Sequence, residues 1–451
     1  MKKIVFYTLS LTLAFANYQP MSARDITARK DSCTTTAATE DVHISLNKAF
    51  NLASAYNATL QRSRLDYKIS REQSASANAI FMPQVDFQYT AMVTDNPLNS
   101  FGFKLNQRIV TSQDFMPESL NEPNASHDYS AQLQLQQPLL NLDAIYNRKS
   151  ARDAARMKQH SMQRTQEYLE FQVEQAYLQI GLAYRNVAVI KESVISAAAF
   201  EKRAQGMYDE GMIQLSDLLE AKAYHLKMRS QLQVAQSGIA NSSDQLSLLM
   251  GQHGDIIYKV DEVTEQMPDK SLESIGNRSD LLAYRAGLSA AENQIRASKM
   301  SFLPHLNAFG TYQLNDKKIF GTNANSYMLG ISLSWKLFGG TQRIHQFRQT
   351  KLERSIVESQ LSETERQAQA DYNKALRSLN DLELETQQAS LMVKQMDEAW
   401  RIQKDRYEQG LSPTSDLLRI QSQLAQQRLM LEQIYFKRKV TIAWLHFTIG
   451  H

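Results

Sequence analysis

The stretch from Thr341 to Gln409 contains neither glycine nor proline. Glycine weakens a helix and proline breaks one, so their absence favours a single uninterrupted helix over the whole stretch. At about 1.5 Å per residue, such a helix would be roughly 100 Å long. A second stretch, from Leu142 to Met207, contains no proline and has Gly181 and Gly206 as its only glycines. Ordinary globular cores do not contain helices of this length, so the chain is expected to be built around them.

Shorter helices are predicted on either side of the two long ones. They cover 217–249 and 415–447, and two more lie near 44–79 and 280–301. The helical faces are rich in Ala, Ser, Gln and charged residues, with apolar residues only at intervals, such as Leu169, Val173, Ala176, Tyr177 and Ile180. This narrow seam is typical of coiled coils, in which small residues allow helices to approach closely.

Four short stretches alternate apolar and polar residues with a period of two: 85–93, 129–137, 306–314 and 327–337. Each pattern predicts a strand with one apolar and one polar face. The lengths are close to the ~9–11 residues of a tilted transmembrane strand, and aromatic residues gather in and beside the strands, as they do at membrane interfaces. The polar faces are mostly Gln, Ser, Thr and Asn, which suit a water-filled lumen. Alternation alone also fits two amphipathic hairpins in a soluble sheet.

Two connections, 94–128 and 315–326, join the strands in pairs and are expected to be extracellular loops; the first is long and polar. A sheet in a membrane must close, because an open edge leaves unpaired N–H and C=O groups in hydrocarbon. The smallest known barrels have about eight strands, so the four strands of one chain cannot close a barrel alone. The chain is therefore predicted to oligomerise.

The N-terminus has the features of a secretory signal. Lys2 and Lys3 precede an apolar run from Ile4 to Leu13, which is too short to span a bilayer. The signal peptide is expected at 1–23, with cleavage after residue 16 or after residue 23, followed by a polar segment at 24–43. The single cysteine, Cys33, excludes an internal disulfide framework and a multi-cysteine metal site. The residues before Cys33 are not the small, apolar ones of a lipidation site, so no lipid anchor is expected there.

The two halves of the chain share a motif. Tyr208-x-x-Gly211-x4-Ser216-Asp217-Leu218-Leu219 recurs as Tyr407-x-x-Gly410-x4-Ser415-Asp416-Leu417-Leu418. Each half reads helix, strand, loop, strand, long helix, tight turn, short helix, which predicts an internal duplication. The first repeat is expected at 44–250 with its tip turn at 208–216, and the second at 278–451 with its tip turn at 407–415. An equatorial connection, 251–277, would join the repeats.

The chain resembles the TolC-type outer-membrane factor family of efflux and type I secretion channels. The resemblance covers nearly the whole chain after the signal and rests on a set of motifs in order: Ile44-Ser45-Leu46-x-x-Ala49-Phe50-x-Leu52-Ala53, the Phe-x-Pro pairs ending at Pro83 and Pro304, Gln137-Pro138-Leu139-Leu140, Leu337-Phe338-Gly339-Gly340, and the doubled tip motif. It implies a mixed fold of long helices and membrane strands. In such a fold a homotrimer forms a twelve-stranded transmembrane β-barrel in outer-membrane lipid and a periplasmic α-barrel. A periplasmic adaptor (membrane fusion) protein would connect this duct to an inner-membrane pump of RND or ABC type.

The resemblance also points to candidate gate residues in the two tip turns. Asp217 and Tyr407 occupy positions that look like a pair linking the turns in the closed state, and Asp416 looks like a member of an acidic ring that narrows the pore. Arg419 stands where some relatives carry a second acid, and Ser412 where some carry a linking arginine. The candidate site therefore comprises Tyr208, Gly211, Asp217, Tyr407, Gly410, Asp416 and Arg419.

Other classes of function have less support in the sequence. None of the nine histidines has metal-ligand spacing to another, and no nucleophile elbow or phosphate loop occurs, so neither catalysis nor a cofactor is expected. A net charge of +3 is small for 451 residues and gives no reason to expect nucleic acid. The alternative is a periplasmic coiled-coil scaffold without channel activity, which explains the helices and the signal but not the two pairs of strands.

Overall fold

The computed structural model describes residues 42–265 and 275–450. The expected signal peptide, most of the polar segment after it and Cys33 lie outside the described residues, as does part of the equatorial connection. Within the described part, no helix combines the length and the apolar character that crossing a membrane requires.

Four strands form one antiparallel sheet in the order β2-β3-β5-β6. Their bounds are β2 (Gln84–Thr94), β3 (Ser126–Leu140), β5 (His305–Asp316) and β6 (Ala324–Ser334). Strands therefore occur at all four predicted places. The prediction that the fourth strand reaches Leu337 was wrong, because β6 ends at Ser334. Ser334 pairs with His305, and Pro304, the residue before His305, has no N–H to continue the ladder. A strand ends where its partner ends, and its own alternation does not show this.

The two long helices are α5 (Leu142–Asp209, 68 residues) and α8 (Gln342–Glu408, 67 residues). The seam predicted on α5 is buried at Leu169, Val173, Ala176, Tyr177 and Ile180. Each long helix turns into a shorter antiparallel one, α6 (Leu215–Leu249) after α5 and α9 (Thr414–Ile449) after α8. Helix α7 (Ser279–Met300) leads into β5.

The single helix predicted near 44–79 was wrong, because the segment is divided at Asn57. Strand β1 (Val42–Ile44) is followed by α1 (Leu46–Tyr56), α2 (Ala58–Ser76) and the short turn η1 (Ala79–Phe81). Asn57 Oδ1 accepts hydrogen bonds from the N–H groups of Thr59 (2.9 Å) and Leu60 (3.1 Å), and so caps α2. Its Nδ2 donates to the carbonyl oxygen of Leu249 at 2.9 Å, which anchors the break to the end of α6.

The connection between β2 and β3 is not an irregular loop. It contains α3 (Pro97–Asn106), η2 (Ser112–Phe115) and α4 (Pro117–Asn121). Pro97 and Pro117 each stand in the first turn of a helix, where proline is favoured because its missing N–H is not needed. The buried carboxylate of Asp128 on β3 accepts hydrogen bonds from Gln107 (2.9 Å) and Asn315 (3.0 Å), which fastens this connection to β3 and β5.

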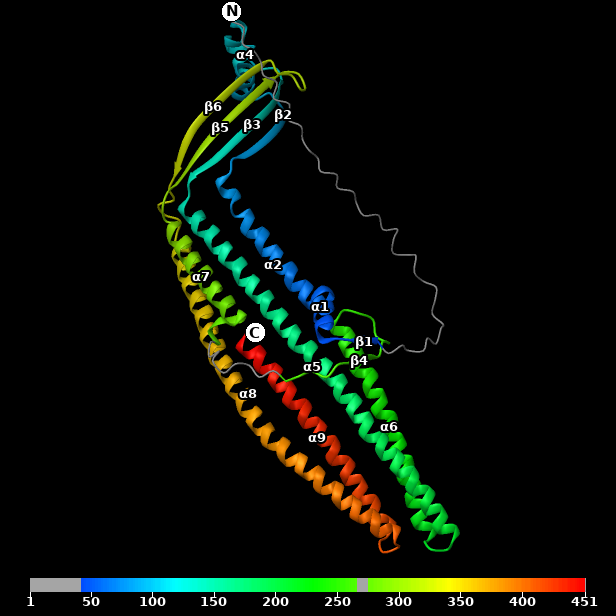
Figure 1. The fold of residues 1–451 in the computed structure, drawn as a ribbon. Helices are drawn as coiled ribbons and strands as arrows, with labels where there is room; N and C mark the ends of the chain where they lie inside the picture. The colour runs from blue at the N-terminus through cyan, green and yellow to red at the C-terminus, as the bar shows by residue number, and fades with distance from the viewer. Residues whose placement is uncertain (1–41, 266–274, 451) are drawn as a thin grey trace, which may run out of the picture. The chain divides into compact units, whose positions relative to one another are not determined.

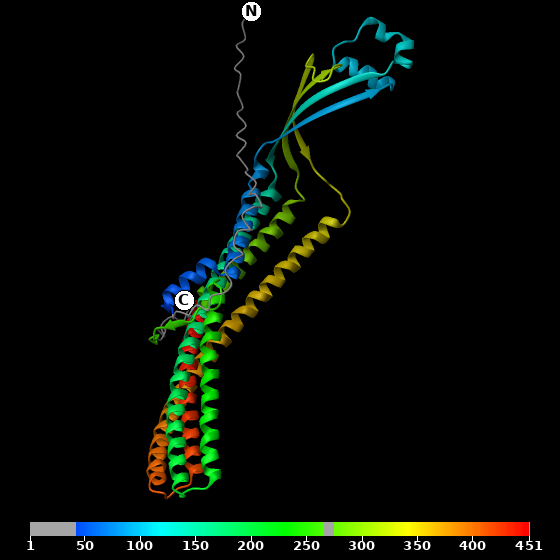
Figure 2. The ribbon, with the colours of Figure 1, turned by 90° about the vertical axis from the view of Figure 1, so that its right-hand side faces the viewer.

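The helices lie side by side in the same order as the strands to which they connect. Helix α2 leads into β2, β3 into α5, α7 into β5, and β6 into α8. Near the sheet, α5 accordingly packs against α2 and α7, and α7 packs against α8. Farther from the sheet, α6 lies below α2 and α9 lies below α7, so that α5 packs against α6 and α9, and α9 against α8 (Figures 1 and 2). The helices thus form a curved layer of four columns.

Helices α9 and α7 meet end to end beside α5. Arg164 of α5 donates to the carbonyl oxygen of Phe447 at 3.0 Å, and Arg278 donates to that of Thr448 at 3.5 Å. These carbonyl groups lie in the last turn of α9, beyond its regular i→i+4 bonds, and that of Phe447 also accepts the Gly450 N–H at 3.3 Å. Arg278 also pairs with Asp280 in the first turn of α7, at 2.7 Å. Side chains therefore join the two helices where the backbone does not.

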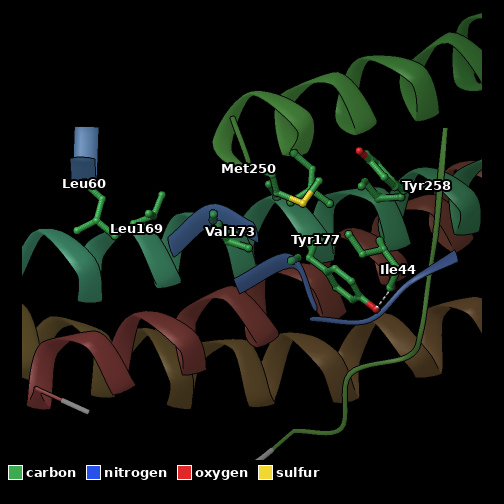
Figure 3. Packing of buried hydrophobic residues seen from close by; sticks show 12 residues of the cluster. Ile44, Leu60, Leu169, Val173, Tyr177, Met250 and Tyr258 are labelled. Atoms are coloured by element: carbon green, nitrogen blue, oxygen red, sulfur yellow. Dashed lines mark hydrogen bonds between the residues drawn. The ribbon is translucent and has the colours of Figure 1, made fainter. Parts of the chain in front are cut away.

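A hydrophobic cluster fills the level at which these breaks occur. Tyr177 of α5 lies at its centre, with Ile44, Met250 and Tyr258 around it (Figure 3). The Tyr177 hydroxyl donates to the carbonyl oxygen of Ile44 at 3.0 Å. Strand β1 pairs in parallel with β4 (Tyr258–Val260), so the two segments cross α5 together.

Candidate functional site: the two tip turns

The two turns that reverse the long helices have the same backbone. Gly211 and Gly410 both have φ of +73°, a left-handed conformation that glycine adopts without strain. Gly211 N–H donates to the Tyr208 carbonyl at 2.9 Å and Met212 N–H to the Met207 carbonyl at 2.8 Å. The second turn repeats this pair of bonds from Gly410 and Leu411, at 3.0 and 2.9 Å. Each long helix therefore ends in a Schellman motif, which satisfies its last carbonyl groups.

The two tyrosines of the repeated motif lie in different surroundings. The Tyr208 side chain is 38% exposed, whereas that of Tyr407 is 2% exposed. Tyr407 belongs to a hydrophobic cluster, here called the tip cluster, whose members come from all four helices at this end: Phe200, Tyr407, Leu417 and Leu418, with Met207, Tyr224 and Trp400 packed against them. Tyr407 is thus a packing residue between the two helical hairpins.

The tip cluster also holds polar atoms without partners. Within the described residues, the hydroxyl groups of Tyr407 and Tyr224 and the Trp400 Nε1 are buried and make no hydrogen bond. Burial raises the pKa of Tyr224 to about 12. Two side chains of α9, Thr414 and Gln421, likewise have a buried oxygen without a partner in this part of the chain. A buried polar group without a partner typically destabilises its surroundings by about 1–3 kcal/mol.

Asp217 caps the helix that follows the first turn. Its carboxylate accepts a hydrogen bond from the Gln214 N–H at 3.2 Å, as one half of a capping box. Among the described residues no hydrogen bond joins Asp217 to Tyr407, whose hydroxyl lies inside the tip cluster. The link between these two residues stays a prediction.

Asp416 cannot repeat that capping bond. The residue at the position of Gln214 is Pro413, which has no N–H to donate. The Asp416 carboxylate instead lies 3.4 Å from the Arg419 Nη2, and both side chains are accessible to solvent. Ser412, in the same turn, accepts a hydrogen bond from Gln403 Nε2. An acid in the first turn of a helix is also favoured by the helix dipole, so Asp416 has a local structural role beside any role in a pore.

Sequence reasoning missed most of the tip cluster. Phe200, Tyr224 and Trp400 carry no motif, and a buried aromatic residue on a long amphipathic helix looks like many others. The available signal was the Leu-Leu pair that ends each copy of the motif, but the copies differ in burial: Leu418 is 5% exposed and Leu219 is 55% exposed. Among the described residues no group of three or more His, Cys, Asp or Glu side chains is placed to hold a metal ion.

Comparisons with known proteins agree with this architecture. The family model described as outer membrane efflux protein matches residues 49–252 and 272–448. The outer membrane protein OprJ of Pseudomonas aeruginosa is 21% identical over 388 residues, which cover 82% of this chain and 76% of OprJ. The outer membrane protein TolC of Vibrio cholerae is 20% identical over 314 residues, which cover 65% of this chain and 66% of TolC.

Solved structures match over almost the whole chain. The structure of CusC has a TM-score of 0.79 at 14% identity and covers 93% of this chain and 95% of its own. The outer membrane protein VceC of Vibrio cholerae has a TM-score of 0.77 at 17% identity, with coverage of 90% and 96%. At these identities the structural matches show that the fold is shared.

Proposed function

The chain belongs to the outer membrane efflux protein family, and on that premise we propose that three copies of it form an exit duct through the outer membrane. The family accounts for location in the outer membrane and for a role in efflux. The proposal adds the homotrimer, its twelve-stranded barrel, and the division of the chain into structural repeats at 44–250 and 278–451.

The alternation of apolar and polar rows across the sheet is the observation that carries the proposal. Reading across the paired strands, one row contains Phe87, Leu133, Tyr312 and Tyr327, and the next contains Asp86, Gln134, Thr311 and Met328. Rows with apolar and aromatic side chains alternate with more polar rows, and residues in one row share a face of the sheet. A coiled-coil scaffold has no need of a sheet with one apolar face open to its surroundings.

The edges of the chain support three copies. Strands β2 and β6 each pair on one side only, so their other edges need partners in a membrane. Helices α6 and α8 are likewise the outer columns of the layer away from the sheet. Both carry exposed leucines at heptad spacing: Leu219 and Leu226 on α6, and Leu384 and Leu391 on α8. Such seams suit helix against helix, so β6 and α8 of one copy would pack on β2 and α6 of the next.

Matched charge substitutions on the two faces test the barrel. Arginine at Leu133 or Leu333, on the proposed lipid face, should impair membrane assembly, by about 2–4 kcal/mol near the midplane and by less at Leu333, which lies one residue before the end of β6. Arginine at Gln134 or Ser332, on the proposed lumen face, should be tolerated. The measurement is the yield of heat-resistant trimer in the outer-membrane fraction, with its mass determined in mild detergent. Equal yields at both pairs of positions, or a folded monomer in that fraction, would contradict the proposal.

The duct is proposed to act in a tripartite efflux or type I secretion system. Its helical tip would meet a periplasmic adaptor that connects it to an inner-membrane pump of RND or ABC type. Support comes from the helices themselves, since α5 and α8 carry the tips far from the sheet on the scale of roughly 100 Å. Mild cross-linking in cells followed by purification of the protein should capture both partners. If membrane fractionation instead finds the protein free in the periplasm, the scaffold alternative holds.

At the tip, threefold symmetry would bring three copies of Asp416 around one axis. The nearby Arg419 would weaken such an acidic ring, because the two side chains pair at 3.4 Å. Arg419→Gln should therefore increase cation selectivity in bilayer recordings, and Asp416→Asn should lower it while leaving the trimer intact. If neither variant changes the reversal potential in a salt gradient, Asp416 is structural and the ring is elsewhere.

A further inference from the structure

The junction between strands and helices exposes a belt of apolar side chains. They lie at the ends of the four strands on the helix side, either in the last residues of β3 or in the turns that connect a strand to its helix: Phe81, Met82, Leu139, Leu140, Phe302, Leu303, Trp335, Leu337 and Phe338. Trp335 Nε1 donates to the Phe302 carbonyl at 3.0 Å, so β6 and β5 are tied together in this belt. Aromatic residues at this level are typical of the boundary between hydrocarbon and headgroups.

Cationic side chains follow directly on the helices. The first five turns of α5, the first turns of α8, the last turns of α7 and the connection before α8 carry them, and they are exposed: Arg148, Lys149, Arg152, Arg156, Lys158, Arg296, Lys299, Lys336, Arg348 and Lys351. The few carboxylates in these turns are engaged nearby. Asp153 is buried, accepts hydrogen bonds from Ser289 and Asn293 at 2.8 and 2.9 Å, and pairs with Arg156 at 3.3 Å. Glu353 accepts one from Gln349. The cations outnumber these carboxylates even when Asp143 and Glu292 are included, so a local excess of positive charge remains.

The same contact between an arginine and a phenylalanine occurs twice in this junction. The guanidinium carbon of Arg148 lies 5.7 Å from the ring centre of Phe81, and that of Arg343 lies 5.2 Å from the ring centre of Phe302. Both are cation–π contacts between a helix and the base of a strand. Since exposed apolar rings in a barrel face lipid, these contacts place the start of each long helix against the lipid side.

Helix geometry extends that side along α5. With 3.6 residues per turn, Lys149, Arg152 and Arg156 project from one face of the helix, next to Arg148. All of these side chains are exposed. At about 1.5 Å per residue, Lys149 lies roughly 10 Å along α5 from Leu142, Arg152 roughly 15 Å and Arg156 roughly 21 Å, so Lys149 is the nearest of the three to the apolar belt.

We infer that these cations, with the apolar belt beside them, bind the phosphate groups of anionic phospholipids in the periplasmic leaflet of the outer membrane. The inference rests on the proposed barrel, which sets the level of the belt at the headgroups. Charge complementarity favours a phospholipid that carries net negative charge over a zwitterionic one. A lipid also fits the junction better than a free anion does, because acyl chains would cover the exposed apolar residues beside the cations.

The test compares two variants that lose the same charge. The intact protein is purified in mild detergent and mixed with phosphatidylglycerol or phosphatidylethanolamine, and the lipids retained by each trimer are counted by native mass spectrometry. The parent should retain phosphatidylglycerol in preference. Lys149→Gln/Arg152→Gln should weaken that retention about fivefold for each cation removed. The matched control, Lys227→Gln/Arg229→Gln, removes two exposed cations from α6 and should retain lipid like the parent.

A second pair of substitutions on the other long helix, Arg348→Gln/Lys351→Gln, should reproduce the loss even if the first pair fails to assemble. Equal retention of both lipids by the parent would overturn the lipid site, as would an equal loss in the control. Displacement of phosphatidylglycerol by soluble glycerol phosphate at the same concentration would overturn it too, in favour of a site for free phosphate. Trimer mass and conductance are measured on the same samples: their absence in the parent contradicts the duct, whereas their presence with equal lipid retention contradicts the lipid site alone.

Discussion

Tyr208 and Tyr407 occupy the same place in two copies of one motif, but 38% of the first and 2% of the second is exposed. The backbones of the two turns have the same φ angle at the glycine and the same pair of Schellman hydrogen bonds. The side chains differ because only the second turn packs between both hairpins, within the tip cluster of Phe200, Tyr407, Leu417 and Leu418.

The comparison separates what a short motif determines from what its neighbours determine. A glycine with positive φ and the bonds around it depend on a few consecutive residues, so they recur wherever the motif recurs. Burial depends on helices distant in the sequence. Within the motif itself, one different residue can change the partner of a side chain. Pro413 in place of a residue with an N–H leaves Asp416 to pair with Arg419 instead of capping α9.

The largest difference is expected when each tyrosine is truncated. Tyr407→Ala removes a buried aromatic ring and should destabilise the tip by about 3–5 kcal/mol, as for other large buried side chains. Tyr208→Ala should cost about 1 kcal/mol or less, because much of that ring is already in water. Hydrogen exchange of the amides in both turns measures the two effects in the assembled protein. Similar exchange in the two variants would mean that assembly buries Tyr208 as well.

The glycines should behave alike, which sharpens the comparison from the other side. Gly211→Ala and Gly410→Ala each place a Cβ in a left-handed conformation, at a cost of about 1–2 kcal/mol. No neighbouring atom obstructs the added Cβ at either position, so backbone strain is the whole effect. The melting temperatures of the two variants should fall by equal amounts. A much larger fall for Gly410→Ala would show that the tip cluster depends on the turn beside it.

The two aspartates should differ by a smaller amount. Asp217→Ala removes the capping bond to Gln214 and should destabilise the start of α6 by about 0.5–1.5 kcal/mol. Asp416→Ala removes an exposed ion pair and should cost about 0.5 kcal/mol. Pro413→Gln restores an N–H donor at the second turn and should make the cost of Asp416→Ala rise to that of Asp217→Ala. Amide exchange in the first turn of each short helix is the measurement, and an unchanged cost in the Pro413→Gln background would contradict the capping argument.

The smallest effect is expected for Tyr407→Phe. The hydroxyl that it removes is buried and has no partner among the described residues, so stability should stay the same or rise slightly. Single-channel conductance should then match that of the parent, with Tyr208→Phe as the matched control. A higher conductance for Tyr407→Phe alone would instead support the link between Tyr407 and Asp217, formed when the chains assemble.

Much of the fold follows from local signals. The bounds of α5 and α8 lie within two residues of the predicted ones, because a long run without glycine or proline leaves few places for a helix to end. The four strands follow from alternation, and the tip turns from their glycines. These features depend on neighbours in the sequence.

The features that were predicted wrongly depend on contacts with residues distant in the sequence. The break at Asn57 is held by the end of α6, the end of β6 by the start of β5, and Tyr407 by residues of α5, α6 and α9. Two helix starts in the connection 94–128 were readable from Pro97 and Pro117, and were missed because that segment is otherwise polar. At the tips, the two turns follow from their repeated motif, whereas the surroundings of Tyr407 and Asp416 do not.

The end-to-end junctions in the helical layer have a mechanical consequence. Two of its four columns, α5 and α8, are continuous, while α2 with α6 and α7 with α9 are interrupted, and the two kinds alternate (Figure 1). A continuous helix bends only by lengthening or breaking its backbone hydrogen bonds, whereas a junction held by the side chains of Arg164 and Arg278 has no such ladder to distort. The layer therefore alternates two stiff continuous helices with two interrupted columns. Bending the layer at this level has to distort the backbone hydrogen bonds of α5 and α8 only, because the two interrupted columns have none across their junctions.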